Sequence, residues 1–252
     1  MAKEREVFGD LSDVYEAMID WPKRLAAEAP FYRRWFERVG VASVLDAACG
    51  TGRHAAMFHS WGLRVEGADV SQEMIDRARA FVGEPPGLRW AVRAFDQPVL
   101  PAEPFDAAIC VGNSLALAPG VDVAGRAIRE LMAAVRPGGA LVIHLLNLWR
   151  LPDGPCVWQK CQRAALARGD VLIVKGVHRC GGRGFVDLVV AGLPDGGRRH
   201  TESVPLLGLE AADLERMARQ SGAAAVSFFG GYQGQPYQRQ ESQDLVMVAQ
   251  RS

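Results

Sequence analysis

The residues best suited to chemistry lie in the segment V-L-D-A-A-C-G-T-G-R-H, residues 44–54. A short apolar run ends in Asp46, and Gly50 and Gly52 flank a threonine just before a run with helical periodicity. Glycine lacks the Cβ that would keep a ligand away from the backbone, and the first turn of a helix presents unpaired N–H groups. The segment therefore predicts a strand–turn–helix unit that holds a nucleotide-like cofactor.

A second acidic residue stands at the end of the next predicted strand. Asp69 ends the apolar run 63–69, nineteen positions after Gly50. In doubly wound folds an acid at the tip of the second strand binds the ribose hydroxyls of the cofactor. Asp69 could instead cap the next helix, but Ser71 is better placed for that role, with Met74 on the inner face. We therefore expect Asp69 to bind a ribose.

The surrounding elements predict an α/β fold. Strand-like runs near residues 44, 65, 89, 107 and 140 alternate with helical periodicity near residues 54, 73 and 124. This alternation predicts a doubly wound, seven-stranded, mostly parallel Rossmann-like sheet. Short strands with glycine turns at 171–174, 184–190 and 200–204 predict an antiparallel β meander inserted after the fifth strand.

Three regions follow from this order of elements. We expect an N-terminal helical lid over residues 1–40, built from helices at 11–20 and 22–38. A cofactor-binding core would cover residues 41–150 and 205–252, and closes with a helix at 209–220 and strands at 225–229 and 244–249. Residues 151–204 would form an inserted subdomain on the substrate side.

Composition excludes several other classes of protein. Lys+Arg and Asp+Glu both number 29 among the 252 residues, so the net charge is zero. This balance argues against a nucleic-acid partner. No apolar run reaches the roughly eighteen residues of a membrane span, and the charged N-terminus has no export signal, so we expect a cytoplasmic protein without a membrane partner. The spacing of Cys156, Cys161 and Cys180 fits no standard zinc pattern, so we expect no metal. The composition is compatible with a homo-oligomer.

Four motifs in order resemble those of the class I S-adenosylmethionine-dependent methyltransferases. They are D-A-A-C-G-T-G at 46–52, A-D-V-S followed by Met74 at 68–74, P-F-D-A-A-I-C at 104–110 and V-R-P-G-G-A-L-V-I at 135–143. The acid of the first motif suits a sulfonium and ammonium ligand and would repel the pyrophosphate of a dinucleotide. The resemblance implies that S-adenosylmethionine is bound by Asp46, Ala48, Gly50, Gly52, Asp69, Val70, Met74, Phe95, Asp96, Val111 and Gly112. In that set Asp96, or Phe95 one residue away, would meet the adenine.

A narrower resemblance points to glycine N-methyltransferase and its relatives. The segments C-V-G-N-S at 110–114 and F-G-G-Y at 229–232 are similar to that group's C-L-G-N-S and F-G-D-F. The resemblance implies that Arg24 grips the carboxylate of the cofactor, that Tyr15 covers the sulfonium and that Asn113 meets the acceptor. Each has a structural alternative: a surface ion pair for Arg24, packing for Tyr15 and helix capping for Asn113. His144 is either a general base or a satisfied core residue.

The departures from that group concern the acceptor. Residues 146–148 read L-N-L where the glycine enzymes read R-N-Y, so the arginine that would grip an amino-acid carboxylate is missing. Glycine is therefore an unexpected substrate, and we predict a larger neutral or aromatic acceptor. The expected substrate contacts are Leu146, Asn147, Trp158 and Tyr232.

The sequence thus predicts an enzyme that methylates a small molecule, by N-methylation through in-line transfer. Two alternatives stay open at this point. One is an O-methyltransferase of secondary metabolism. The other is a cofactor-binding pseudoenzyme or interaction protein that retains the pocket.

Overall fold

The computed structural model describes residues 12–99, 103–166, 169–192 and 199–252. Its centre is a seven-stranded sheet with the order β10-β11-β5-β4-β1-β2-β3. All neighbouring strands are parallel except that β11 runs antiparallel to both β5 and β10. The strands are β1 (Ser43–Asp46), β2 (Arg64–Asp69), β3 (Leu88–Val92), β4 (Phe105–Cys110), β5 (Val135–Leu146), β10 (Ala223–Phe229) and β11 (Asp244–Arg251).

Helices cover both faces of this sheet. The helices are α1 (Ser12–Met18), α2 (Trp21–Val39), α3 (Arg53–Ser60), α4 (Gln72–Val82), α5 (Val121–Ala134) and α6 (Ala211–Gln220). One core cluster joins aromatic residues of α2 and α3, such as Tyr32 and Phe58, to Val44 and Ile109 of the sheet. The other joins Leu131 of α5 and Leu214 of α6 to the opposite faces of the same strands. The doubly wound fold predicted from the sequence is confirmed.

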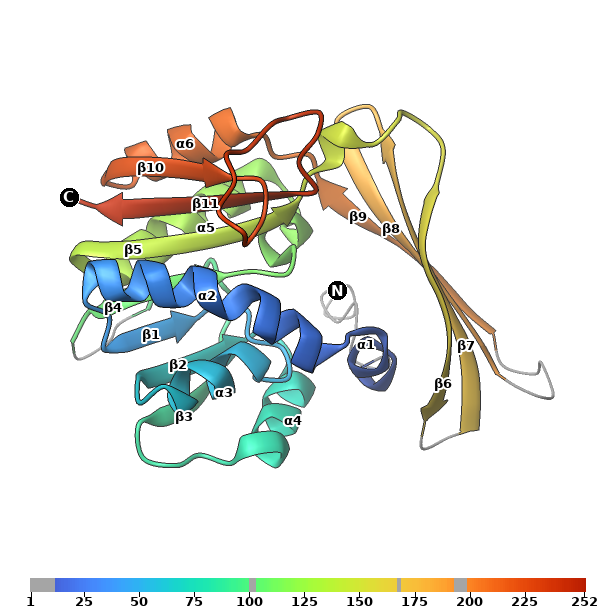
Figure 1. Ribbon diagram of the computed structural model, residues 1–252, viewed down its shortest axis with the longest axis horizontal. Helices are drawn as coiled ribbons and strands as arrows, with labels where there is room; N and C mark the ends of the chain where they lie inside the picture. The colour runs from blue at the N-terminus through green and yellow to red at the C-terminus, as the bar shows by residue number, and fades with distance from the viewer. Residues whose placement is uncertain (1–11, 100–102, 167–168, 193–198) are drawn as a thin grey trace.

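A separate antiparallel sheet faces the carboxyl ends of the parallel strands. It has the order β6-β7-β8-β9 and consists of β6 (Val157–Leu166), β7 (Gly169–Cys180), β8 (Arg183–Gly192) and β9 (Arg199–Leu207). Figure 1 shows the parallel strands of the large sheet pointing toward this small sheet, with α1 between the two. The predicted meander is therefore present, with β6 as an additional strand and β9 ending three residues beyond the expected boundary at 204.

Alternation along the small sheet gives it an inner and an outer face. Ile173 and Val177 of β7 are fully buried, and Ile173 packs with Val14 and Met18 of α1. We call the face that carries Ile173 and Val177 the inner face. The opposite, outer face carries the alternate residues of β7, such as Gly176, together with Trp158 of β6, the cross-strand partner of Gly176.

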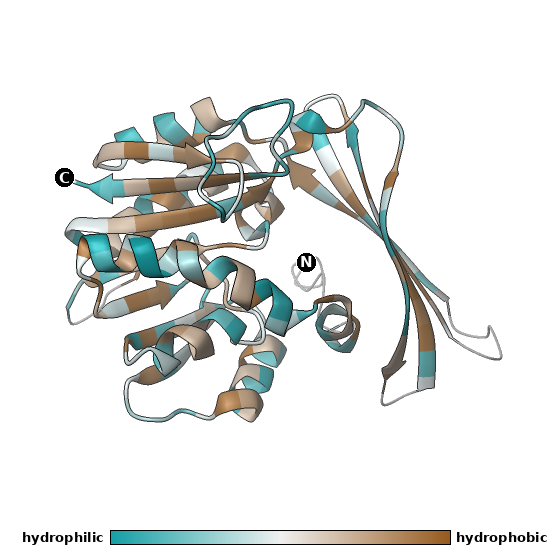
Figure 2. Ribbon diagram, in the orientation of Figure 1, coloured by the Kyte–Doolittle hydropathy of each residue, from teal (hydrophilic) through white to brown (hydrophobic). Residues whose placement is uncertain are grey.

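Hydropathy follows these layers. In Figure 2 the central strands β5 and β11 are largely hydrophobic, whereas the loop between β10 and β11 is largely hydrophilic. Within the described ranges, no helix is both long and apolar enough to span a membrane.

Candidate active site

The glycine-rich loop after β1 and the end of β2 are held together by Asp69. One carboxylate oxygen of Asp69 accepts a hydrogen bond from the N–H of Gly50 at 2.9 Å, and the other accepts from the N–H of Ser71 at 3.0 Å. Ser71 caps α4 by accepting from the N–H of Met74, as expected. Asp69 therefore fixes the shape of the loop, and each oxygen retains a second lone pair with which to bind hydroxyl groups.

Asp46 is the most unusual group at this edge of the sheet. It is 1% exposed, and neither carboxylate oxygen has a hydrogen-bond partner among the described residues. Burial raises the pKa of Asp46 to about 8, with a further contribution from the charge of Asp69; the nearby N–H of Ala48 and the charge of Arg24 lower it only in part. A buried carboxylate without a partner is costly, and a cation placed beside it would relieve that cost. The site therefore fits a cationic ligand such as the sulfonium and ammonium of S-adenosylmethionine.

A buried ionic network lies beside Asp46. The Nε of Arg24 donates to Glu28 at 2.7 Å, and the other oxygen of Glu28 lies 2.7 Å from Nε2 of His54. Burial alone would raise the pKa of Glu28, but the hydrogen bond with His54 and the charge of Arg24 lower it to about 2. Burial lowers the pKa of His54, so this ring is neutral near pH 7 and donates its Nε2–H.

The same network aims Arg24 at the site. A Cβ added to Gly112, just after β4, would lie 3.7 Å from the guanidinium of Arg24. Arg24 also lies close enough to Tyr15 to lower the pKa of that phenol, although burial outweighs this and raises it. Asp46, Asp69, Tyr15 and Arg24 thus meet in one region. The N–H groups of the guanidinium that do not bond Glu28 are suited to a carboxylate.

The ends of β4 and β5 are tied together by Asn113. Asn113 has a left-handed backbone with φ of 74°, alone among the described non-glycine residues. Its N–H donates to the carbonyl oxygen of His144 at 3.2 Å, and its Oδ1 accepts from the N–H of Leu146. The side chain does not cap the following 3-10 helix, so the capping alternative is wrong. The Nδ2 amide of Asn113 makes no hydrogen bond within the described part of the chain.

His144 is a structural residue rather than a base. Its Nδ1 accepts a hydrogen bond from the N–H of Gly112 at 3.2 Å, and its Nε2 faces Asp244 at 3.4 Å. A neutral imidazole has a single basic nitrogen, and here that lone pair is already used. The prediction of a catalytic His144 is wrong for this reason, and the satisfied-core alternative holds.

Asn147, one of the four predicted acceptor contacts, is fully hydrogen-bonded within the protein. Asn147 is 1% exposed: its amide donates to the carbonyl oxygens of Arg239 and Ser242, and its oxygen accepts from Trp149 and Tyr237. All its hydrogen-bonding capacity is used inside the protein, so its prediction as a substrate contact is wrong.

Trp158 does not face the site either. It is 61% exposed and pairs with Gly176 on the outer face of the small sheet. The prediction of Trp158 as a substrate contact is therefore wrong. Leu146 packs against the core of the large sheet.

Tyr232 lies beside Tyr32 and His144. Its hydroxyl accepts from that of Tyr32 at 3.2 Å, and its ring lies 5.3 Å from that of His144. It lines a pocket of about 440 Å³ at the same edge of the sheet, between α2 and the loop joining β10 and β11. Most of the lining residues are of polar type; they are Arg24, Ala27, Glu28, Gly230, Tyr232, Gln233, Gln235, Pro236, Gln238, Glu241, Ser242, Gln243 and Asp244. Of the four residues expected to contact the substrate, only Tyr232 lines this pocket.

Most of the other residues expected to bind the cofactor follow the ends of β1, β2, β3 and β4. Val70 is 45% exposed, so its side chain is accessible to a ligand. Met74 and Val111 are buried, while Ala48 and Phe95 are partly buried against the core. Asp96 forms an ion pair with Arg126 at 3.3 Å, so a hydrogen bond to adenine would share this carboxylate.

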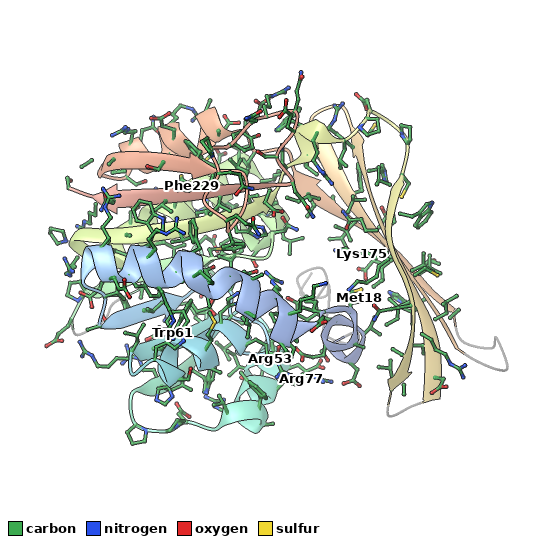
Figure 3. All side chains as sticks on the ribbon, in the orientation of Figure 1. Met18, Arg53, Trp61, Arg77, Lys175 and Phe229 are labelled. Carbon is green, nitrogen blue, oxygen red and sulfur yellow. The ribbon has the colours of Figure 1, made fainter. Side chains whose placement is uncertain are left out.

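Helix α1 lies across the glycine-rich loop. Glu16 of α1 accepts hydrogen bonds from the hydroxyl of Thr51 and the guanidinium of Arg53. Asp13 pairs with Arg77 at 2.6 Å, and Figure 3 shows Arg53 and Arg77 reaching toward α1 from α3 and α4. On its other side, Lys160 and Gln162 of β6 donate to the last carbonyls of α1. Thus α1 bridges the cofactor loop and the small sheet.

The two glycines of the loop have different reasons to be glycine. A Cβ on Gly50 would meet no atom within 4 Å, whereas a Cβ on Gly52 would lie 2.6 Å from the Trp90 ring and 2.9 Å from Cβ of Ala78. The expectation that Gly52 leaves room for the ligand is therefore corrected: it leaves room for Trp90. Only Gly50 faces open space.

These positions give a matched pair of variants. Both glycines have positive φ, so alanine costs about 1–2 kcal/mol of strain at each. We expect Gly50→Ala to lose about 1–3 kcal/mol of cofactor binding through overpacking against the ligand. Gly52→Ala should instead lose stability, because the same overpacking falls on Trp90. Calorimetry measures the cofactor affinity of both variants, and urea unfolding measures their stability. Unchanged cofactor affinity in Gly50→Ala would contradict the close approach of the ligand to Gly50.

Comparisons with known proteins agree with this geometry. A family model described as a methyltransferase domain matches residues 44–139. The glycine/sarcosine N-methyltransferase of Parasynechococcus marenigrum (strain WH8102) is 30% identical over 237 residues, covering 91% of this chain and 80% of that protein. The chain belongs to the class I S-adenosylmethionine-dependent methyltransferases. A second relative of this methyltransferase, dTDP-4-amino-2,3,4,6-tetradeoxy-D-glucose N,N-dimethyltransferase from Saccharopolyspora spinosa, is 31% identical over 57% of the chain and 56% of its own length.

Solved structures give the methyltransferase the same fold. The amino pentose methyltransferase CalS10 from Micromonospora echinaspora, solved with S-adenosylmethionine bound, superposes with a TM-score of 0.71. It is 23% identical and covers 95% of this chain and 97% of its own. As a member of this family the methyltransferase uses S-adenosylmethionine as its cofactor, and the buried Asp46 is suited to the positive charge of that cofactor.

Proposed function

We propose that this methyltransferase transfers a methyl group to the nitrogen of a small-molecule amine. The observation that carries the proposal is that, among the described residues at this edge of the sheet, the histidines are held by the protein and the tyrosines stay protonated. The Nδ1 of His144 accepts from Gly112, His54 is buried against Glu28, and burial raises the pKa values of Tyr15, Tyr32 and Tyr232. A neutral amine attacks without a base, whereas a hydroxyl requires one.

The two relatives support a nitrogen acceptor, since both are named as N-methyltransferases. Asp46 and Asp69 end β1 and β2 beside the glycine-rich loop, and Asp69 accepts a hydrogen bond from the N–H of Gly50 in that loop. We therefore assign both carboxylates to the cofactor rather than to deprotonation of the acceptor.

The roles of the residues follow from their positions. S-adenosylmethionine supplies a methyl group activated by a sulfonium centre. Arg24 would hold its carboxylate, Asp46 its positive charge and Asp69 its ribose. The Nδ2 amide of Asn113 and the hydroxyl of Tyr232 are placed to orient the acceptor. Alignment of acceptor, methyl and sulfur in one line accounts for most of the rate.

We also propose that α1 acts as the lid of the site and that the small sheet forms its acceptor side. The contacts of Glu16 with Thr51 and Arg53 hold α1 over the loop. These contacts are polar, whereas Val14 and Met18 pack against the small sheet through apolar surface. Such a helix can separate from the loop while staying attached to the sheet.

A panel of matched acceptors tests the function. Each amine is paired with the alcohol of the same skeleton, and release of S-adenosylhomocysteine is measured for both. We expect turnover of amines only, increasing with pH as the ammonium form of the amine is lost. Preferred turnover of the alcohols would overturn the nitrogen assignment, and the Asp69→Ala variant controls for cofactor breakdown.

A further inference from the structure

Lys175 occupies an unusual place on the inner face of the small sheet. Strand register puts it between Ile173 and Val177, both fully buried, so its side chain leaves the sheet on the side of α1 and the large sheet. Figure 3 shows Lys175 beside Met18 of α1, in the space between the small sheet and the carboxyl edge of the large one. Asp187 and Trp158 lie on the other face and do not approach it.

The charged groups that act on Lys175 are cations. Its partner across the strands is Lys160, and like charges in directly opposed positions are destabilising. Lys160 donates to the carbonyl oxygen of Met18, but Lys175 has no hydrogen bond or ion pair with any residue that the structure describes. Burial lowers the pKa of Lys175, and the charges of Lys160 and Arg24 lower it further.

A carboxylate on the same face of the small sheet, that of Glu202, is already engaged. Glu202 of β9 lies two strands away from Lys175 in register, a backbone separation of about 10 Å. Its carboxylate pairs with His200 at 3.4 Å. The carboxylate of Glu28 is likewise taken by Arg24 and His54. The positive charge of Lys175 is therefore uncompensated within the described chain.

We propose that Lys175, with Lys160 beside it, binds an anionic group of the methyl acceptor, a phosphate or a carboxylate. The inference rests on the proposed function, which places the acceptor between the small sheet and the ends of β4 and β5. An anion here would receive charge-assisted hydrogen bonds in a region of low dielectric. It would also remove the repulsion between the two lysines. Because Lys175 lies on β7 and Asn113 on the large sheet, the acceptor is larger than glycine, with its anionic group remote from its amine.

This subsite changes the expectation drawn from residues 146–148. The missing arginine there favoured a neutral acceptor, but Lys175 supplies a cation from a different element of the fold. The acceptor can then be charged without using that position.

The test measures anion binding to the methyltransferase by calorimetry. The protein is saturated with S-adenosylhomocysteine, so no methyl transfer takes place. The probes are inorganic pyrophosphate for a phosphate group and succinate for a carboxylate. We expect at least one to bind, and Lys175→Met to weaken it about tenfold or more, as for a hydrogen bond to a charged group. Lys175→Arg should keep most of the affinity, and Lys23→Met, on exposed α2 surface, should keep all of it. Lys175→Met should also raise the melting temperature, because it removes an uncompensated charge from the inner face.

Three results would overturn the subsite. The first is that neither probe binds the wild-type protein. The second is that the Lys175→Met variant binds the probe as tightly as the wild-type protein does. The third is that Lys175→Met loses affinity for S-adenosylhomocysteine instead of for the probe. The last would assign the lysine to the cofactor carboxylate. Anion binding without methylation of any amine would contradict the proposed function and leave the subsite standing, so the two failures are distinguishable.

Discussion

S-adenosylmethionine should bind the wild-type protein about tenfold more tightly at pH 7 than at pH 6. The pKa of Asp46 is about 8 in the free protein, so this carboxyl is mostly protonated at both values. Binding of a cation requires the ionised form, and the free protein must first release a proton. Affinity therefore falls about tenfold for each pH unit below the pKa. Calorimetry in buffers of different ionisation enthalpy would also detect the released proton.

The Asp46→Asn variant is the control for this dependence. The amide cannot ionise, so its affinity should be weaker than wild type at pH 7 and change little between pH 6 and pH 7. The free energy of unfolding provides a second reading. The unfolded carboxyl ionises near its ordinary pKa while the folded one stays protonated, so this group lowers stability as pH rises from about 4 to 8. Asp46→Asn should lack that loss, and an equal pH dependence in both proteins would contradict the assignment.

Arg24→Met should reduce the free energy of unfolding by about 3–5 kcal/mol, the cost of leaving one partner of a buried ion pair alone. Glu28 is 4% exposed, and without Arg24 only neutral His54 faces its carboxylate. Urea unfolding measures the loss. Lys23→Met, one residue earlier on the exposed surface of α2, should be close to neutral.

The double variant Arg24→Met/Glu28→Met separates stability from binding. Removing both charges should recover much of the stability, since no buried carboxylate is left unpaired. Affinity for S-adenosylmethionine should stay low, because the cation for the cofactor carboxylate is still missing. Wild-type affinity in the folded double variant would mean that Arg24 serves only the protein's own network.

The cofactor half of the site could be predicted because local chemistry determines it. Asp46, Gly50 and Asp69 stand at fixed offsets from strand ends, and parallel strands bring those ends to one edge of a sheet. The i,i+4 spacing of Arg24 and Glu28 was a further readable signal of a helical ion pair. His54, which completes that network, carried no such signal, because it joins from another helix.

The acceptor half could not be predicted in the same way, because long-range contacts decide it. His144 and Asn147 look like free polar residues at a strand end, yet Gly112 and the loop before β11 use their hydrogen-bonding atoms. Trp158 lies beside an irregularity in β6, where the register shifts between Trp158 and Lys160. Such a bulge breaks the alternation from which a buried face is read. The cation at Lys175 also depends on strand pairing, which places it opposite Lys160.

The most direct test identifies the atom of the acceptor to which the methyl group becomes bonded. The protein is incubated with S-adenosylmethionine carrying ¹³C in its methyl group and with an amino alcohol that also bears a remote phosphate or carboxylate. The product is then examined by ¹³C NMR, in which N-methyl and O-methyl carbons are resolved. We expect an N-methyl signal that grows with release of S-adenosylhomocysteine. An O-methyl signal alone, from an acceptor that offers both atoms, would contradict it.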